Sequence, residues 1–376
     1  MRILADENMP LVREMFDSLG TVETLPGREI TRERLTSVDM LLVRSVTKVN
    51  ADLLADTPVR FVGSATSGID HVDTAYLAER GIEFAYAPGS NANSVAEYVV
   101  AALVVLGERD GFDPADLQVG VVGAGHVGNR VIERVEALGA RCIAYDPPLA
   151  RVLPDKSFAL IDALYSCDVI TLHVPLEHGG SNPTYHLVDE SFLARTKPGS
   201  ILINAARGGV VDECALLRAR ASGRVRHFVL DVWEGEPAPN PEMIRAAAIA
   251  TPHIAGYSYD GKLNGTLALY DAARKFQGRT DNSVCPFDRP EGTDRIVCST
   301  LASAVREAYD IMADDARMRP LADLDELACG TAFDRLRKSY PMRREFVHHR
   351  IRLRDEDTKL RTTLTRLGFT LLGPHE

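Results

Sequence analysis

Three polar residues follow or interrupt apolar runs in the second half of the sequence, and their types suit the oxidation of an alcohol. Arg207 follows ILINAA, Glu236 lies within DVWEGEP, and His253 follows IATP. When a hydride leaves a hydroxyl-bearing carbon, the hydroxyl proton must leave as well, and histidine exchanges protons near neutral pH. We therefore predict that His253 is the general base and that Glu236 orients its ring and stabilises the imidazolium.

Two further residues complete the predicted reacting groups. An arginine can bind a carboxylate through two parallel hydrogen bonds and polarise the neighbouring oxygen, so Arg207 is the predicted clamp for a 2-hydroxy acid. Asp231 ends the apolar run FVL and is predicted to face the nicotinamide of a bound cofactor. Taken singly, each of these residues could be an ordinary surface or core residue. Together on one sheet they favour a dehydrogenase.

The segment LQVGVVGAGHVG, residues 117–128, has the glycine spacing of a dinucleotide-binding turn. An apolar strand at 119–122 leads into Gly123, which would make the tight turn. Gly125 would let the pyrophosphate approach the backbone, and Gly128 would let the following helix pack closely on the strand. His126 and Val127, between the last two glycines, are predicted to line the same cofactor site.

A second apolar strand, residues 141–145, ends at Asp146. A carboxylate at this place can accept hydrogen bonds from the ribose hydroxyls of NAD, and its charge would repel the 2′-phosphate of NADP. A solvated turn residue is the alternative interpretation. NAD is the predicted cofactor.

The elements that must position these residues alternate between β-rich runs and amphipathic stretches, which predicts an α/β fold with parallel sheets. Strands are expected at 2–5, 39–43 and 60–63. A long apolar helix at 94–109 would carry the chain out of a first domain, and a helix from 258 to about 276 could return to it. A turn-rich linker is expected at 286–292, before a last segment whose residue pattern differs from that of the preceding domains.

The bulk properties exclude several function classes. The 376 residues carry a net charge of −10, which argues against general nucleic-acid binding. No apolar run reaches the length of a membrane span, and the start MRILADENMP does not resemble a secretory signal. The six cysteines have no metal-ligand spacing, so we expect no metal site and reduced thiols in the cytoplasm.

The motifs NAARGGVVDE, DVWEGEP and TPHIAG together resemble the D-isomer-specific 2-hydroxyacid dehydrogenases, over about residues 1–280. The resemblance implies the same roles for Arg207, Glu236 and His253. It also implies two doubly wound parallel-sheet domains, a flavodoxin-like substrate domain (1–93 and 257–286) and an NAD-binding Rossmann domain (94–256). An α+β domain at 287–376 would form a homodimer.

Further segments resemble a branch of this family that oxidises a phosphorylated four-carbon 2-hydroxy acid. They are ENMP near the start, VRSVTKVN, VGSATSGIDHVD, GERDGF and HIAGYSYDGK. This likeness implies that Ser45, Thr66 and Tyr257 contact the substrate. It implies further cofactor-lining positions at Pro175, Ala205, Ala206 and Gly256.

Some alternatives stay open. The substrate could be 3-phosphoglycerate or another D-2-hydroxy acid, and a non-catalytic NAD-sensing corepressor could share this fold. The arginines clustered between 335 and 354 could form a solvated face. Alternatively, Arg343 or Arg344 could cross a dimer interface to meet the substrate phosphate.

Overall fold

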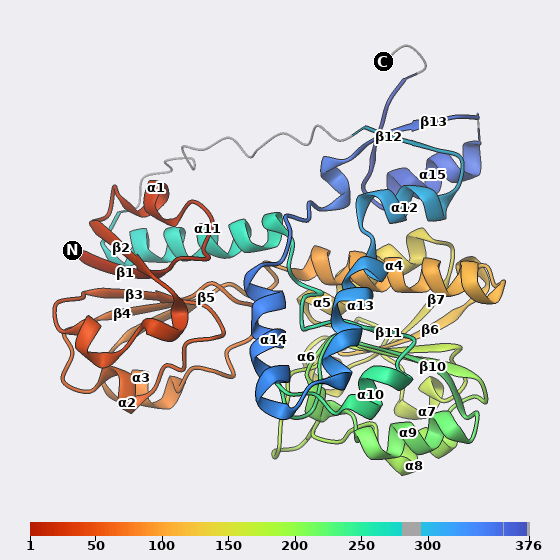
Figure 1. Ribbon diagram of the computed structural model, residues 1–376, viewed down its shortest axis with the longest axis horizontal. Coiled ribbons are helices and arrows are strands. Elements are labelled where there is room, and N and C mark those ends of the chain that lie inside the picture. The colour runs from red at the N-terminus through yellow and green to blue at the C-terminus, as the bar shows by residue number, and fades with distance from the viewer. Residues whose placement is uncertain (280–294, 356, 374–376) are drawn as a thin grey trace. The chain divides into compact units, whose positions relative to one another are not determined.

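The computed structural model describes residues 1–279, 295–355 and 357–373, drawn in Figure 1. Among them, residues 1–91 and 258–279 form one compact unit, and residues 92–257 and 295–373 form a second. The linker expected at 286–292 lies outside the described residues. Each unit is built on its own parallel sheet.

The first unit contains five parallel strands in the order β2-β1-β3-β4-β5, the arrangement of flavodoxin-like sheets. The strands predicted at 2–5, 39–43 and 60–63 are confirmed, as is the returning helix α11, which packs on β4 and β5. The strands are β1 Arg2–Asp6, β2 Thr21–Leu25, β3 Met40–Val43, β4 Phe61–Ser64 and β5 Glu83–Tyr86. The helices are α1 Val12–Phe16, α2 Ala51–Leu54, α3 Thr74–Glu79 and α11 Tyr259–Phe276, with 3-10 turns at Gly27–Glu29 and Arg32–Leu35.

The second unit contains six parallel strands in the order β11-β10-β9-β8-β6-β7. Strand β6 lies between β7 and β8, so the direction of strand addition reverses beside it, and ligands of such sheets bind at the carboxyl ends of the strands there. The strands are β6 Gln118–Val122, β7 Arg141–Tyr145, β8 Val169–Leu172, β9 Ser200–Asn204, β10 Val225–Leu230 and β11 Ile249–Ala250. The helices around this sheet are α4 Ala92–Asp110, α5 His126–Ala137, α6 Pro147–Val152, α7 Ile161–Leu164, α8 Glu190–Arg195, α9 Glu213–Ala221 and α10 Pro241–Ala246, with 3-10 turns at Pro114–Asp116 and Gly208–Val210.

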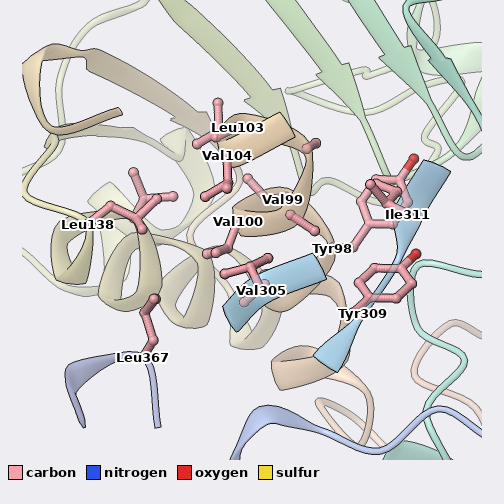
Figure 2. Packing of buried hydrophobic residues seen from close by; sticks show 14 of the residues in the cluster. Tyr98, Val99, Val100, Leu103, Val104, Leu138, Val305, Tyr309, Ile311 and Leu367 are labelled. Atoms are coloured by element: carbon pink, nitrogen blue, oxygen red, sulfur yellow. The ribbon is translucent and has the colours of Figure 1, made fainter. Parts of the chain in front are cut away.

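Helix α4 forms the centre of the largest core of this unit (Figure 2). Its side chains Val99, Val100 and Leu103 are fully buried among residues of α5 and of the C-terminal segment, including Val305 and Leu367. A helix that is apolar on every side is stable in water only when protein surrounds it. In the described part of the chain, no helix is long and apolar enough to cross a membrane.

The C-terminal segment forms a three-stranded parallel sheet in the order β12-β13-β14 and packs within the second unit. Its helix α13 lies against β11, the outermost strand of the six-stranded sheet, where Asp315 accepts a hydrogen bond of 2.7 Å from the backbone N–H of Ala250. Arg319 pairs with Asp315 at 2.6 Å. The elements are β12 Arg295–Cys298, β13 Arg350–Leu353, β14 Thr370–Leu371, α12 Leu301–Ala308, α13 Ile311–Met318, α14 Glu326–Lys338 and α15 Thr358–Arg366, with 3-10 turns at Arg319–Asp323 and Phe346–His348.

We expect Asp315→Ala to lower the free energy of unfolding by about 2–4 kcal/mol, because it leaves a buried N–H and a paired arginine without their acceptor. Chemical denaturation measures the change. Glu326→Ala, at an exposed position of α14, is the control and should change stability by less than about 0.5 kcal/mol. Equal stability of the two variants would contradict the role assigned to Asp315.

Candidate active site

The carboxyl ends of three neighbouring strands of the second unit carry the predicted reacting residues. Arg207 lies just after β9, Asp231 directly after β10, and His253 just after β11. These strands are adjacent in the sheet, and all are parallel. The structure therefore brings all three residues to one edge of one sheet, as their positions after apolar runs predicted.

His253 and Glu236 form a direct pair. The Nδ1 atom of His253 lies 2.8 Å from Oε2 of Glu236, and the other oxygen of Glu236 accepts the backbone N–H of Trp233 at 3.0 Å. Burial alone would raise the pKa of Glu236, but His253, Arg337 and the N–H of Trp233 together hold it below its usual value. Glu236 is thus an ionised partner that fixes the ring of His253, and this contribution to stability is lost as the pH falls through the lowered pKa.

The backbone of His253 adopts a left-handed conformation, with φ of 58°. This conformation costs a residue with a side chain about 1–2 kcal/mol. The carboxylate of Asp231 offsets the cost, because it accepts hydrogen bonds from the N–H groups of Ile254 and Ala255, at 2.7 and 2.8 Å, and from the hydroxyl of Thr251 at 2.6 Å. Asp231 is 1% exposed, and its observed role is to hold the loop of His253. A contact with the nicotinamide stays a prediction for this residue.

Arg207 is presented by a turn that is held to its neighbours through the backbone. The side-chain amide of Asn204 donates to the carbonyl of Arg207 at 2.9 Å, and the guanidinium donates to the carbonyl of Ala206 at 2.7 Å. A Cβ atom on Gly208 would overlap the carbonyl group of Trp233. The turn after Arg207 therefore lies against the loop that carries Glu236, and only glycine allows that approach.

The glycine-rich turn fits a dinucleotide. Gly123 has φ of 85°, and a Cβ on Gly128 would overlap the carbonyl oxygen of Gly123. Gly125 precedes α5, and a Cβ there would have no neighbour within 4 Å, so the space beside the helix N-terminus is open. Free N–H groups and the positive end of the helix dipole meet at this place, which suits a pyrophosphate.

Asp146 follows β7, next to the glycine-rich turn. One oxygen accepts the N–H of Ala124 and the other accepts the N–H of Leu149, both at 2.9 Å. These bonds fix the carboxylate and leave further lone pairs for ribose hydroxyls. The other predicted cofactor positions lie on the same turn or after strands of the same sheet, namely His126, Val127, Pro175, Ala205, Ala206 and Gly256.

The first unit carries two of the predicted substrate contacts at one edge of its sheet. Ser45 follows β3 and is exposed, and Thr66 follows the neighbouring strand β4. The hydroxyl of Thr66 donates to the carbonyl of Gly68 at 2.7 Å and lies 2.6 Å from that of Ser64, which in turn contacts His71. His71 thus helps to fix the turn that carries Thr66, through its contact with Ser64.

Arg343, one of the two C-terminal arginines that could meet a substrate phosphate, is bound within its own chain. Arg343 is 6% exposed and donates to the backbone carbonyls of Ser94 and Ala255 of its own chain, at 2.8 and 3.0 Å. Its guanidinium also lies 4.1 Å from the ring centre of Tyr309. These contacts occupy Arg343 within its own chain, and the same alternative for Arg344 stays a prediction. Arg337, which the sequence did not single out, lies beside Tyr257 instead.

The sequence of this chain is similar to those of known families and proteins. Residues 101–255 match the NAD-binding domain of the D-isomer-specific 2-hydroxyacid dehydrogenases, and residues 287–368 match a domain of unknown function. The erythronate-4-phosphate dehydrogenase of Salinibacter ruber is 47% identical over 93% of this chain and 94% of its own. That of Cronobacter sakazakii is 45% identical over 98% of both chains.

This chain belongs to the erythronate-4-phosphate dehydrogenase family, within the D-isomer-specific 2-hydroxyacid dehydrogenases. It is an NAD-dependent dehydrogenase of the α/β class, as predicted. The D-lactate dehydrogenase of Aquifex aeolicus, solved with NAD and lactic acid, matches 74% of this chain and 96% of its own, with a TM-score of 0.62 and 25% identity. The NAD-dependent formate dehydrogenase of Staphylococcus aureus, solved with NAD, matches 75% of this chain and 98% of its own, with a TM-score of 0.61.

In this member of the erythronate-4-phosphate dehydrogenase family, two glycine substitutions should separate folding from cofactor binding. Gly128→Ala should lower the free energy of unfolding by about 1–3 kcal/mol, because its Cβ has no room. Gly125→Ala should leave the melting temperature nearly unchanged, since its Cβ meets open space, yet weaken NAD binding by filling the approach of the pyrophosphate. Calorimetry and NAD titration measure the two effects. NAD affinity equal to wild type in Gly125→Ala would rule out this path to the helix.

We expect Asp231→Asn to destabilise the fold by about 1–3 kcal/mol, because its amide cannot accept both backbone N–H groups of the His253 loop. The turnover number should fall as well, since the loop no longer holds its left-handed turn. Thermal unfolding and initial rates of NADH formation measure the change. Asp271→Asn, on the exposed side of α11, is the matched control. A variant as stable and active as this control would contradict the assignment.

Proposed function

We propose that this chain oxidises 4-phospho-D-erythronate to 2-oxo-3-hydroxy-4-phosphobutanoate with NAD, a step in pyridoxal 5′-phosphate synthesis. The observation that carries the proposal is the likeness to curated erythronate-4-phosphate dehydrogenases over almost the whole chain, at 44–47% identity. This likeness includes the C-terminal segment, beyond the part that matches the NAD-binding domain model.

His253 would remove the substrate hydroxyl proton. Its Nδ1 is engaged by Glu236, so Nε2 is the nitrogen that can accept a proton. The ionised carboxylate of Glu236 then stabilises the imidazolium. NAD, when bound at the glycine-rich turn, supplies the acceptor for the hydride that leaves C2. The contact between His253 and Glu236 supports turnover more than a purely NAD-sensing role.

Arg207 would bind the C1 carboxylate and polarise the oxygen on C2. Ser45, Thr66 and Tyr257 would bind the substrate, with hydroxyls suited to a phosphate at C4. The hydroxyl of Thr66 is already fixed in a turn, which reduces the entropy lost on binding. Asp146, His126 and Val127, with the backbone of residues 123–128, would hold NAD, together with Pro175, Ala205, Ala206, Asp231 and Gly256.

The protein would work in the cytoplasm as a homodimer formed through its C-terminal segment. Support for this interface comes from large apolar side chains that the segment leaves exposed, including Leu327 at 84%, Met342 at 74% and Val347 at 51%. Scattered apolar residues are common on surfaces, but several on one segment favour a contact with another protein. Light scattering of the purified protein tests the dimer.

The substrate assignment is tested by mixing the protein with NAD and 4-phospho-D-erythronate and following NADH absorbance. The same measurement with 3-phosphoglycerate gives the comparison. A 2-oxo acid is included in a parallel reaction, so that NADH retained by the enzyme can be reoxidised and turnover observed. A higher kcat/KM for 3-phosphoglycerate would reject the proposed substrate.

Substitutions at the reacting pair should separate chemistry from binding. We expect His253→Asn to lower kcat by roughly 10²–10⁴-fold, because it removes the general base, while the Kd for NAD stays close to wild type. Glu236→Gln should also lower kcat, since the ring loses its ionised partner. Glu234→Gln is the control, because Glu234 pairs with His186 and not with His253. Retention of full kcat in His253→Asn would exclude this residue as the base.

A further inference from the structure

Helix α14 of the C-terminal segment brings an arginine to the predicted active site. The guanidinium carbon of Arg337 lies 5.6 Å from the ring centre of Tyr257 and 5.9 Å from that of Phe333. Phe333 is fully buried on the same helix, so this part of α14 is fixed in the core and holds the backbone of Arg337 in place. Its side chain is thereby directed at Tyr257, four residues after the predicted general base.

Tyr257 also contacts a second residue of the C-terminal segment, Tyr340. Its ring meets the ring of Tyr340 edge-on, with centres 5.9 Å apart and planes at 82°. The hydroxyl of Tyr340 donates to Asp314 at 2.7 Å, which fixes Tyr340 in turn. A tyrosine that contacts both a cation and an aromatic ring has fewer orientations of its phenol open to it.

The groups that act electrostatically on Arg337 are residues of the predicted active site. Burial alone would lower the pKa of Arg337, but Tyr257, Glu236 and Asp231 outweigh burial and raise it. The effect is reciprocal, because Arg337 is one of the groups that lower the pKa of Glu236. Its Nε is buried without a hydrogen-bond acceptor among the described residues, a cost that electrostatic attraction must offset.

We propose that Arg337 is a positioning residue of the active site, through which the C-terminal segment fixes the phenol of Tyr257 and brings a positive charge to the predicted reacting groups. The inference rests on the proposed roles of His253, Glu236 and Tyr257. It assigns a function in catalysis to a segment that matches a domain family of unknown function. Arg337 touches no reacting atom in this role and acts through its neighbours.

The anchoring of the C-terminal segment does not depend on Arg337. Other residues tie this segment to the rest of the unit, with Asp315 bonded to the N–H of Ala250 and Arg343 bonded to the carbonyls of Ser94 and Ala255. The loss of Arg337 should therefore leave the fold in place. This separation makes a catalytic defect measurable in a folded protein.

Other titratable groups near Glu236 must be controlled in any pH measurement. Burial, with help from Glu234 and Glu236, raises the pKa of Glu213 to about 7. Glu234 itself pairs with His186 at 2.6 Å. Glu213→Gln removes the titration that falls within the neutral range, so it is the background in which the His253–Glu236 pair is best observed.

The kinetic test compares Arg337→Met with Arg335→Met, an exposed position on the same helix. In Arg337→Met we expect kcat/KM to fall by roughly 10–100-fold, because Tyr257 loses its fixed orientation. The low-pH limb of the kcat/KM profile should move upward by roughly 0.5–1 unit, since a cation no longer opposes protonation of the pair. Arg337→Lys should restore the position of the limb but not the full rate, because it restores charge without the planar guanidinium.

A second measurement needs neither substrate nor turnover. Trp233 is the sole tryptophan, and its backbone N–H donates to Glu236, so its fluorescence can report protonation of the pair in the cofactor-free protein. In the Glu213→Gln background, the midpoint of the fluorescence titration should move upward in Arg337→Met and stay in place in Arg335→Met. Thermal unfolding confirms that both variants are folded.

The outcomes separate this inference from the proposed function. A wild-type protein that oxidises no D-2-hydroxy acid would reject the function, while the fluorescence midpoint would still test the contact of Arg337 with the pair. A folded Arg337→Met variant with wild-type kcat/KM and an unmoved midpoint would overturn the inference. Equal shifts in Arg337→Met and Arg335→Met would also overturn it, because they would reflect only a change in overall charge.

Discussion

The carboxylate of Asp231 holds His253 in a backbone conformation that a histidine rarely adopts, and the direction of the imidazole ring follows from it. Two backbone N–H groups and the hydroxyl of Thr251 donate to this carboxylate. Thr251 in turn lies 2.8 Å from the hydroxyl of Tyr98, within the buried helix α4. Bonds to a charged acceptor contribute about 1.5–3 kcal/mol each, more than the left-handed turn costs. The packing of α4 thus determines, through three residues, where the imidazole points.

Much of the fold could be predicted from the sequence, because its elements are strongly patterned. The apolar runs that became β1, β3 and β6 are short and end in polar or small residues, and the continuous apolar stretch of α4 allows only a buried helix. The parallel pairing of β12 with β13 could not be predicted, since the two strands are far apart in the chain. Nor does any local pattern show that the C-terminal segment packs within the core around α4.

The site was predictable where chemistry and position agree. An arginine and a histidine after apolar strands point to the edge where a parallel sheet binds its ligands, so Arg207 and His253 could be placed at that edge without coordinates. The contact of His253 with Glu236 agrees with the predicted pairing. Sequence could not distinguish Arg337 from Arg343, because both occur among many arginines. Only the folded chain shows that Arg343 is buried against backbone carbonyls and that Arg337 lies beside a tyrosine. The structural role of Asp231 could not be predicted either, since it bonds to two backbone N–H groups as well as to the hydroxyl of Thr251.

The position of α13 against β11 has a consequence for how the outer edge of the six-stranded sheet is kept from pairing with a strand of another chain. Strand β11 has only two residues and is the outer strand of its sheet, so its backbone groups would be open to pairing with another chain. Asp315 occupies the N–H of Ala250 that such a pairing would use. The C-terminal segment therefore covers an edge whose backbone groups would otherwise be open to pairing. A version of the enzyme shortened to the NAD-binding sheet would leave the N–H of Ala250 without its acceptor and the edge at β11 uncovered by α13.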